Sequence, residues 1–327
     1  MTTPSLGPTG SPLKSPYLSP GPGRGSALSI LWRRAISTSS VAWAWALLIP
    51  SLLLVLGIIV YPLVTGVNLS LHRVILTRLD LGRPFVGFDN FLRMLSDPVM
   101  GFAWLNTLFY AVVGVGSQFV VGLIAALLLN RSSTRMWIPR TILMLPWFLP
   151  PIAAAYMFAF MIDPRYGIIT RVLGVVGIDI GGQGVLANPT CAIWGALAVE
   201  LWRGYPFFAL FLLAGLQAIP TDLGEAAAID GANRRQYFWH VVWPLLRPIV
   251  IVSTLLDGIR LATSPVMLLL LTNGGPGNST QVVSLYAFQQ AYQRFDFGYA
   301  SAISVALLVA ITGFAMVYVR INSGRGK

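Results

Sequence analysis

Long uncharged runs alternate with short polar segments along most of the chain. The cleanest of these runs are residues 35–71, 99–130, 141–162 and 297–319. Each is long enough to supply the ~20 helical residues that cross the hydrocarbon core of a bilayer. This pattern predicts four membrane-spanning helices.

Two further apolar runs, residues 191–217 and 248–271, each contain one acid and one arginine three residues apart. The charged residues are Glu200 and Arg203 in the first run and Asp257 and Arg260 in the second. An ionised side chain within a span costs roughly 2.5–3.5 kcal/mol on insertion scales, so we expect these groups to face protein or a water-filled path instead of lipid. With these two spans, the sequence predicts an all-α polytopic membrane protein with six transmembrane helices.

Composition agrees with a membrane protein. The chain has 327 residues, of which 56% are apolar and 10% are charged, and its mean hydropathy is +0.73. Such a sequence is too apolar for an ordinary soluble domain. The net charge of +11 does not indicate a nucleic-acid partner, because the basic residues are spread over loops on both sides of the predicted membrane. The single cysteine, Cys191, excludes an internal disulfide and any cysteine-based zinc site.

The basic residues also orient the chain, because short cytoplasmic loops accumulate Lys and Arg. With the N-terminus inside, thirteen basic residues fall in cytoplasmic segments and seven in outer loops. The cytoplasmic set is Lys14, Arg24, Arg33, Arg34, Arg131, Arg135, Arg140, Arg234, Arg235, Arg247, Arg320, Arg325 and Lys327, and the outer set is Arg73, Arg78, Arg83, Arg93, Arg165, Arg171 and Arg294. We therefore expect both termini in the cytoplasm. Arginine far outnumbers lysine, which favours a GC-rich genome and therefore a bacterial source. For a helical multi-pass protein of a bacterium we expect a location in the inner (cytoplasmic) membrane.

The N-terminal segment has a different composition from the spans. Its prolines, at Pro4, Pro8, Pro12, Pro16, Pro20 and Pro22, lie among Gly, Ser and Thr residues. Such a segment cannot bury enough apolar surface to order itself. The sequence predicts a disordered cytoplasmic tail over residues 1–34 and one six-helix transmembrane domain over residues 35–327.

A polar, helix-forming segment at residues 220–245 separates the fourth and fifth predicted spans. It predicts a short helix that begins near Thr221, because capping groups and acids precede a run of alanines. Gly231 then permits a sharp turn that a residue with a Cβ would resist. A helix–turn–helix on the cytoplasmic side fits a cleft on another protein, and an ordinary amphipathic linker at the lipid interface is the alternative.

The spacing of this segment resembles the coupling loop of permease subunits in ATP-binding-cassette (ABC) importers. The matching residues are Glu225, Ala226, Ala227, Gly231 and Pro244, and Trp243 stands where the family often has leucine before the proline. Three other blocks are similar to maltose-type sugar permeases: Phe88-Asp89-Asn90-Phe91, residues 214–220 and the pair formed by residues 271–277 and 297–302. Pro265-Val266 departs from the family, which often has an aromatic and an acid there.

This resemblance implies a type I ABC importer permease fold and a subunit that forms half of a heterodimeric pore. It implies a second homologous permease, two ATPase subunits, an extracytoplasmic substrate-binding protein, and a sugar or oligosaccharide as substrate. The chain itself has no Gly-x4-Gly-Lys-Ser/Thr sequence, since its only lysines are Lys14 and Lys327. We therefore expect no cofactor in this chain, with ATP and Mg bound by the ATPase subunits.

The charged residues within the spans are the candidate substrate pathway. Each acid can reach its arginine along one helix face, so Glu200 with Arg203 and Asp257 with Arg260 can border a path for a polar substrate or only fix helix packing. Trp202 and Tyr205 flank Arg203, and an aromatic ring beside hydrogen-bonding groups suits a sugar ring, although aromatics in spans also serve as packing or interface anchors.

Other functions remain open at this stage. An importer for glycerol phosphate or another polyol derivative would use Arg203 and Arg260 to bind an anionic group. A secondary transporter or channel would work without ATP and would need ion sites among the intramembrane acids. An enzyme is not expected, because His72 and His240 fall on opposite sides of the predicted membrane and cannot share a metal.

Overall fold

The apolar runs fold into helices, as lipid requires of a chain whose backbone groups must bond internally. The computed structural model describes residues 40–78, 80, 82–130, 137–177 and 184–323, so the predicted tail at residues 1–34 lies outside the described residues. The chain divides into two units, residues 1–62 and 63–327. Within the described part of the first unit, α2 (Ser40–Val55) continues through a π-helical turn (Leu56–Val60) into α3 (Tyr61–Ser70), which crosses the boundary between the units.

The second unit contains the remaining helices. In chain order these are α4 (Asp89–Ser96), α5 (Pro98–Leu129), α6 (Trp137–Phe148), α7 (Pro151–Ile162), α8 (Ile168–Val175), a 3-10 turn (Val185–Ala187), α9 (Ala192–Gln217), α10 (Thr221–Ile229), α11 (Arg234–Tyr237), a π-helical turn (Phe238–Val242), α12 (Trp243–Thr263), α13 (Val266–Leu271), α14 (Val283–Tyr292) and α15 (Phe297–Ser323).

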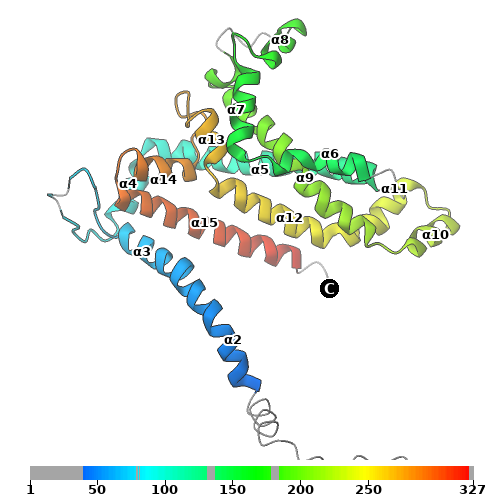
Figure 1. The fold of residues 1–327 in the computed structure, drawn as a ribbon, viewed down its shortest axis with the longest axis horizontal. Coiled ribbons are helices and arrows are strands. Elements are labelled where there is room, and N and C mark those ends of the chain that lie inside the picture. Colours follow the sequence, from blue (N-terminus) through cyan, green and yellow to red (C-terminus); the bar gives the residue numbers. More distant parts are fainter. Residues whose placement is uncertain (1–39, 79, 81, 131–136, 178–183, 324–327) are drawn as a thin grey trace, which may run out of the picture. The chain divides into compact units, whose positions relative to one another are not determined.

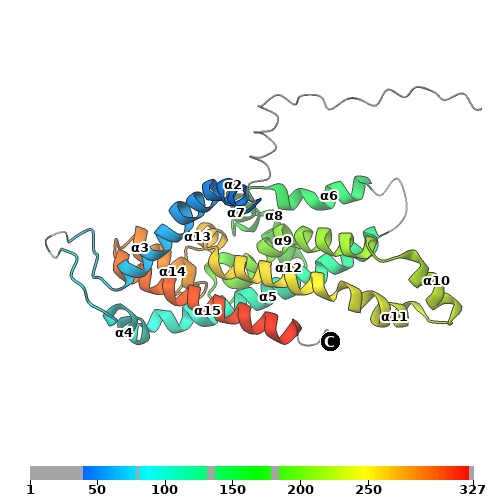
Figure 2. The ribbon, with the colours of Figure 1, turned by 90° about the horizontal axis from the view of Figure 1, so that it is seen from below.

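Four long helices of the second unit lie side by side. Figures 1 and 2 show α5, α9, α12 and α15 running together, with α10 and α11 at one end and α4 and α14 at the other. Fully buried Phe208 and Leu212 of α9 pack with Leu246 of α12 and Ala126 of α5 near the α10 end. Tyr286 of α14 and Tyr299 of α15 are buried near the opposite end.

The number of spans depends on how one bent pair is counted. Within the described residues, five helices are long and apolar enough to cross a membrane, and the pair α6 and α7 would make a sixth. That pair covers the predicted third span but bends by 92°. Pro150 and Pro151 explain the break, because proline lacks a backbone N–H and disfavours a helical residue before it. The six-span prediction thus holds if the bent pair is one span.

The fifth span differs from its predicted limits of residues 248–271. Its helix begins earlier, because α11, the π-helical turn and α12 are continuous over Arg234–Thr263. It also ends earlier: Ser264 is extended, with φ −90° and ψ 111°, as expected for a residue before a proline. The chain then starts the separate helix α13 after Pro265.

Candidate functional site

The coupling segment, residues 220–245, projects at the end of the long helices. Its first helix, α10, starts at Thr221 as the sequence predicts, and none of the side chains in α10 or α11 is buried. Ile229 at the end of α10 is 86% exposed, which is unusual for a large apolar side chain that does not face lipid or a partner. Glu225 and Ala226 are exposed as well, and Ala227 is half-buried.

The turn after α10 explains why glycine occupies position 231. The Ala232 N–H donates to the Ala227 carbonyl at 2.9 Å, and the Gly231 N–H donates to the Ala228 carbonyl at 3.1 Å. This pair of bonds ends a helix when the residue just after the helix, here Gly231, is in the left-handed conformation. Gly231 has a φ of +73°, which glycine adopts without the strain that a Cβ would cause. The turn is therefore a fixed helix ending, and it sets the direction in which the chain leaves α10.

The second half of the coupling segment joins directly to a membrane span. Asn233 accepts a hydrogen bond from the Gln236 N–H at 2.9 Å, and the Gln236 side chain accepts one from the Asn233 N–H at 2.8 Å. This capping box starts α11, which continues into α12 through Pro244. A groove of about 540 Å³ lies behind α10, where Gly224, Glu225 and Ala228 face the end of α9 and Tyr237.

The four charged residues of the candidate pathway meet inside the helix bundle. Arg260 of α12 donates to Glu200 of α9 at 2.5 Å and to Asp257 at 2.8 Å. Arg203 donates to Glu200 over a longer 3.3 Å. Both acids are 2% exposed, so their charges are held by the arginines instead of water. The spacing predicted the two pairs within α9 and α12, and the structure adds the bond between the helices.

A cavity of about 230 Å³ opens beside these charges. Its lining includes Arg203, Asp257 and Arg260 together with the aromatic rings of Trp147 and Phe207. The Arg260 side chain is 34% exposed, whereas that of Glu200 is 3% exposed. The cavity wall therefore combines two guanidinium groups and Asp257 with aromatic side chains, while Glu200 lies deeper in the protein.

The two other predicted pathway residues make different contacts. The Trp202 ring packs edge-on against Phe158 of α7, with ring centroids 5.1 Å apart. The Tyr205 hydroxyl donates to the Leu143 carbonyl of α6 at 3.3 Å. Both side chains thus join α9 to the bent pair α6 and α7, and neither is among the residues that line the cavity beside Arg203.

Gln118 of α5 belongs to the same cluster, although the sequence reasoning did not select it. It is fully buried, and its Oε1 accepts from Arg260 over a long 3.5 Å. A polar residue in an otherwise apolar span is the signal that would have pointed to it, because such residues face protein or a pathway. Trp147 was also missed, since a tryptophan at the end of a helix gives no indication of which cavity it lines.

A second polar cluster ties together the ends of α4, α5, α14 and α15 that lie opposite the coupling segment. Asp97, which caps α5, accepts hydrogen bonds from Tyr286 at 2.6 Å and Tyr299 at 2.8 Å. Arg93 of α4 pairs with Asp296 at 2.7 Å. Burial raises the pKa of Asp97, but the bonds from Tyr286, Tyr299 and the Val99 N–H, with the nearby Arg93 charge, more than offset it, so this pKa lies below its ordinary value of 3.8.

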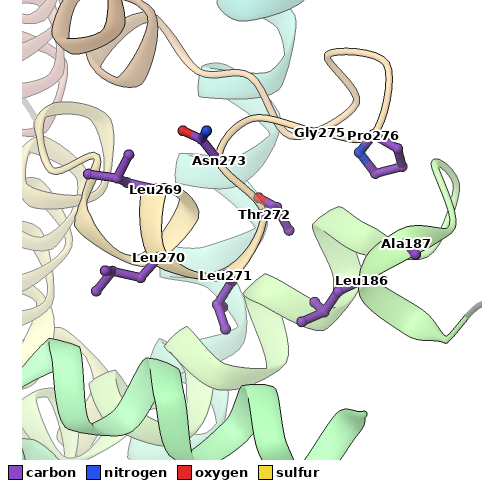
Figure 3. Close-up of a pocket in the computed structure, with 9 residues that line it drawn as sticks. All are labelled: Leu186, Ala187, Leu269, Leu270, Leu271, Thr272, Asn273, Gly275 and Pro276. Atoms are coloured by element: carbon purple, nitrogen blue, oxygen red, sulfur yellow. The ribbon is translucent and has the colours of Figure 1, made fainter. Parts of the chain in front are cut away.

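A pocket of about 480 Å³ lies next to the segment that resembles the sugar-permease loop. Figure 3 shows Leu186 and Ala187 across from Leu271, Thr272 and the residues that follow them. The loop is held by side-chain bonds, since the Thr272 and Thr280 hydroxyls are 2.7 Å apart and the Gln289 amide donates to the Asn273 carbonyl at 3.0 Å. This loop is therefore held in one conformation by its own side chains and by Gln289 of α14.

Comparison with known proteins identifies the family. The sequence pattern of the family described as "Binding-protein-dependent transport system inner membrane component" matches residues 118–324. The chain belongs to this family. It is 34% identical over 281 residues to the trehalose/maltose transport system permease protein MalF of Thermococcus litoralis, a match that covers 86% of this chain and 94% of the relative. It is 33% identical to the sulfoquinovosyl glycerol transport system permease protein SmoG of Agrobacterium fabrum, with 89% and 93% covered.

Solved structures agree on the fold. A bacterial ABC transporter involved in import of the acidic polysaccharide alginate contains a chain that matches with a TM-score of 0.76 and 20% identity, covering 91% of this chain and 100% of that one. The predicted type I ABC importer permease fold is thereby confirmed. Members of this permease family are transport subunits and not enzymes. This chain is therefore a multi-pass membrane transport subunit.

Proposed function

We propose that this chain is one half of the membrane pore of an ATP-driven importer for a sugar or oligosaccharide. Its similarity to MalF and SmoG supports a sugar-containing substrate. The remaining parts would be a second homologous permease, two ATPase subunits that bind ATP and Mg, and an extracytoplasmic binding protein. A periplasmic binding protein is present in the complex of the structurally similar alginate transporter.

The observation that carries the coupling part of this proposal is the connectivity of the coupling segment. α9 ends at Gln217 and α10 begins at Thr221, while α11 continues without a break into α12. A force applied to α10 and the Gly231 turn is therefore transmitted to two neighbouring spans. Those two spans carry the charge cluster, which is formed by Glu200, Arg203, Asp257 and Arg260. An ATPase docked on the coupling segment can therefore change the geometry of this cluster.

The charge cluster and its cavity are the proposed substrate pathway. Sugar hydroxyls both donate and accept hydrogen bonds, and Arg203, Arg260 and Asp257 supply both partners at the cavity wall. The rings of Trp147 and Phe207 supply apolar faces for a sugar ring. We assign Trp202 and Tyr205 to holding α9 against α6 and α7, so that they support the path from behind.

The coupling proposal is tested by affinity purification and uptake. We expect the tagged wild-type chain to recover an ATPase subunit, and Glu225→Lys or Gly231→Pro to lose both this subunit and uptake of labelled maltose or trehalose. Asp89→Lys, at an exposed acid in the first turn of α4, is the control and keeps both. Uptake that survives in the Glu225 and Gly231 variants contradicts the proposal.

The energy source separates this importer from a secondary transporter. Vanadate, which inhibits ABC ATPases, is expected to stop uptake, and a protonophore added at constant cellular ATP is expected to leave it intact. The reverse pattern would indicate ion-coupled transport. Competition by excess unlabelled glycerol phosphate would move the substrate class from sugars to polyol phosphates.

A further inference from the structure

Gln118 joins the charge cluster from α5. It is 0% exposed, and its Nε2 has no hydrogen-bond partner in the described residues. Leaving a buried amide N–H unpaired costs free energy, so a glutamine at this position is not explained by stability alone. An apolar residue of the same size would fill the space without that cost.

The neighbouring helix provides space for this side chain. A Cβ added at Gly204 of α9 would overlap the Gln118 amide, so the glycine leaves a niche in which the amide lies. Gly204 also lines the cavity beside Arg203 and Arg260. Gln118 therefore lies one layer behind the cavity wall, in contact with one wall residue and near another.

The position of Gln118 relative to Arg260 indicates its role. Arg260 has Asp257 and Glu200 as acceptors, and the Gln118 Oε1 is a further acceptor for its NH2 group. These acceptors lie on α12, α9 and α5, so contacts from three helices act on one planar guanidinium group. The third contact is long, so it steers the orientation of Arg260 and adds little binding strength.

We propose that Gln118, seated against Gly204, is a positioning residue that sets the orientation of Arg260 at the cavity wall and so determines substrate affinity. This inference rests on the proposed pathway through the charge cluster. Gln118 itself does not touch the substrate. Gln118 acts on the substrate only through the orientation of Arg260. Filling the niche at Gly204 of α9 would displace the Gln118 amide and so disturb the same orientation.

Two variants reach the same group from different helices. Gln118→Leu removes the acceptor with little change in size, and Gly204→Ala forces the amide out of its niche. Gly258→Ala is the matched control, because Gly258 is on the same helix as Arg260. A Cβ there would make only an ordinary contact with Val115 at 3.9 Å. Gln118→Glu restores the acceptor and is expected to rescue the orientation of Arg260.

The first readout needs no ligand. The purified full chain is treated with phenylglyoxal, and modification of each arginine is followed by peptide mass spectrometry. We expect Arg260 to react about threefold faster in Gln118→Leu and Gly204→Ala, as loss of a weak hydrogen bond predicts, with Arg320 unchanged as internal reference. Equal Arg260 rates in wild type and both variants overturn the inference.

The second readout is uptake of labelled maltose by cells that express the whole importer. KM is expected to rise about threefold in Gln118→Leu and Gly204→Ala with the maximal rate retained, because only orientation of a binding group is altered. Arg260→Met separates the two proposals. If it leaves KM unchanged, the proposed pathway fails; if it raises KM while both Gln118→Leu and Gly204→Ala do not, only the role of Gln118 fails.

Discussion

At the scale of single residues, Glu200 is a buried acid that contacts two arginines. It is 2% exposed within a span and is bonded to Arg203 and Arg260. Glu200→Gln keeps the shape and removes the charge, which leaves Arg260 with Asp257 as its remaining acidic partner. We expect a loss of about 3 kcal/mol, since breaking a buried pair is costly.

This prediction is checked by thermal unfolding of the purified chain in detergent. The midpoint is expected to fall by several degrees in Glu200→Gln. Glu225→Gln is the control, because Glu225 is exposed and takes part in no buried pair. Equal midpoints for wild type and Glu200→Gln would show that the pair between α9 and α12 contributes no net stability.

Asp97 gives a prediction that depends on pH. The pKa of Asp97 in the folded protein lies below 3.8, whereas an aspartate in the unfolded chain has a pKa of about 3.9. The carboxylate therefore stabilises the fold fully above the unfolded pKa, and this contribution is lost as pH falls through the folded pKa. Asp97→Asn is therefore expected to unfold at a lower temperature than wild type at pH 7, and this difference is expected to shrink near pH 3.5. A difference that stays constant with pH contradicts the assignment.

Residue spacing was enough to indicate which charges form pairs along one helix. Glu200 with Arg203 and Asp257 with Arg260 follow from positions three apart, and both pairs are present. The bond from Arg260 to Glu200 could not be predicted, because it depends on the register between α9 and α12, which the sequence of either helix does not contain. Gln118 is different, because its polarity within an apolar span was a readable signal and only its partners in α9 and α12 depend on the register.

At the scale of elements, the capping box at Asn233 defines where the long helix of the fifth span begins. Asn233→Ala removes the acceptor for the Gln236 N–H, and such a change costs about 1 kcal/mol of helix stability. We expect faster hydrogen exchange at residues 234–237, with no change in α10. Gln217→Ala, at the exposed end of α9, is the control, and unchanged exchange in Asn233→Ala would show that α11 is held by packing alone.

Prolines decided where the elements differ from the sequence prediction. Hydrophobicity marks residues 141–162 as one span, but Pro150 and Pro151 divide it into α6 and α7. Pro265 likewise separates α13 from α12, although residues 248–271 read as one apolar run. Pro244 does not divide the fifth span, since α11, the π-helical turn and α12 are continuous around it. Hydropathy therefore predicts that a span exists more reliably than it predicts its path.

At the scale of the whole molecule, the long helices of the second unit connect two different ends. Figure 1 shows α10 and α11 of the coupling segment at one end of these helices and α4 and α14 at the other. Asp97, Tyr286 and Tyr299 belong to the second end, and Glu200 lies within α9. Blocks far apart in sequence meet at the second end: Asn90 donates to the His72 carbonyl at 3.0 Å, and Gly298 packs against the same residue. This arrangement suits a subunit that receives substrate at one end and force at the other.

The orientation of these two ends in the membrane is the last prediction. The excess of basic residues places the coupling segment in the cytoplasm and residues 72–97 outside. Cys191→Ser gives a background without cysteine, to which Ile229→Cys or Phe85→Cys is added, both at exposed positions. A membrane-impermeant maleimide is expected to label Phe85→Cys on spheroplasts and to label Ile229→Cys only after the membrane is opened. Labelling of Ile229→Cys from outside would reverse the orientation and remove the basis for ATPase coupling, since the nucleotide is in the cytoplasm.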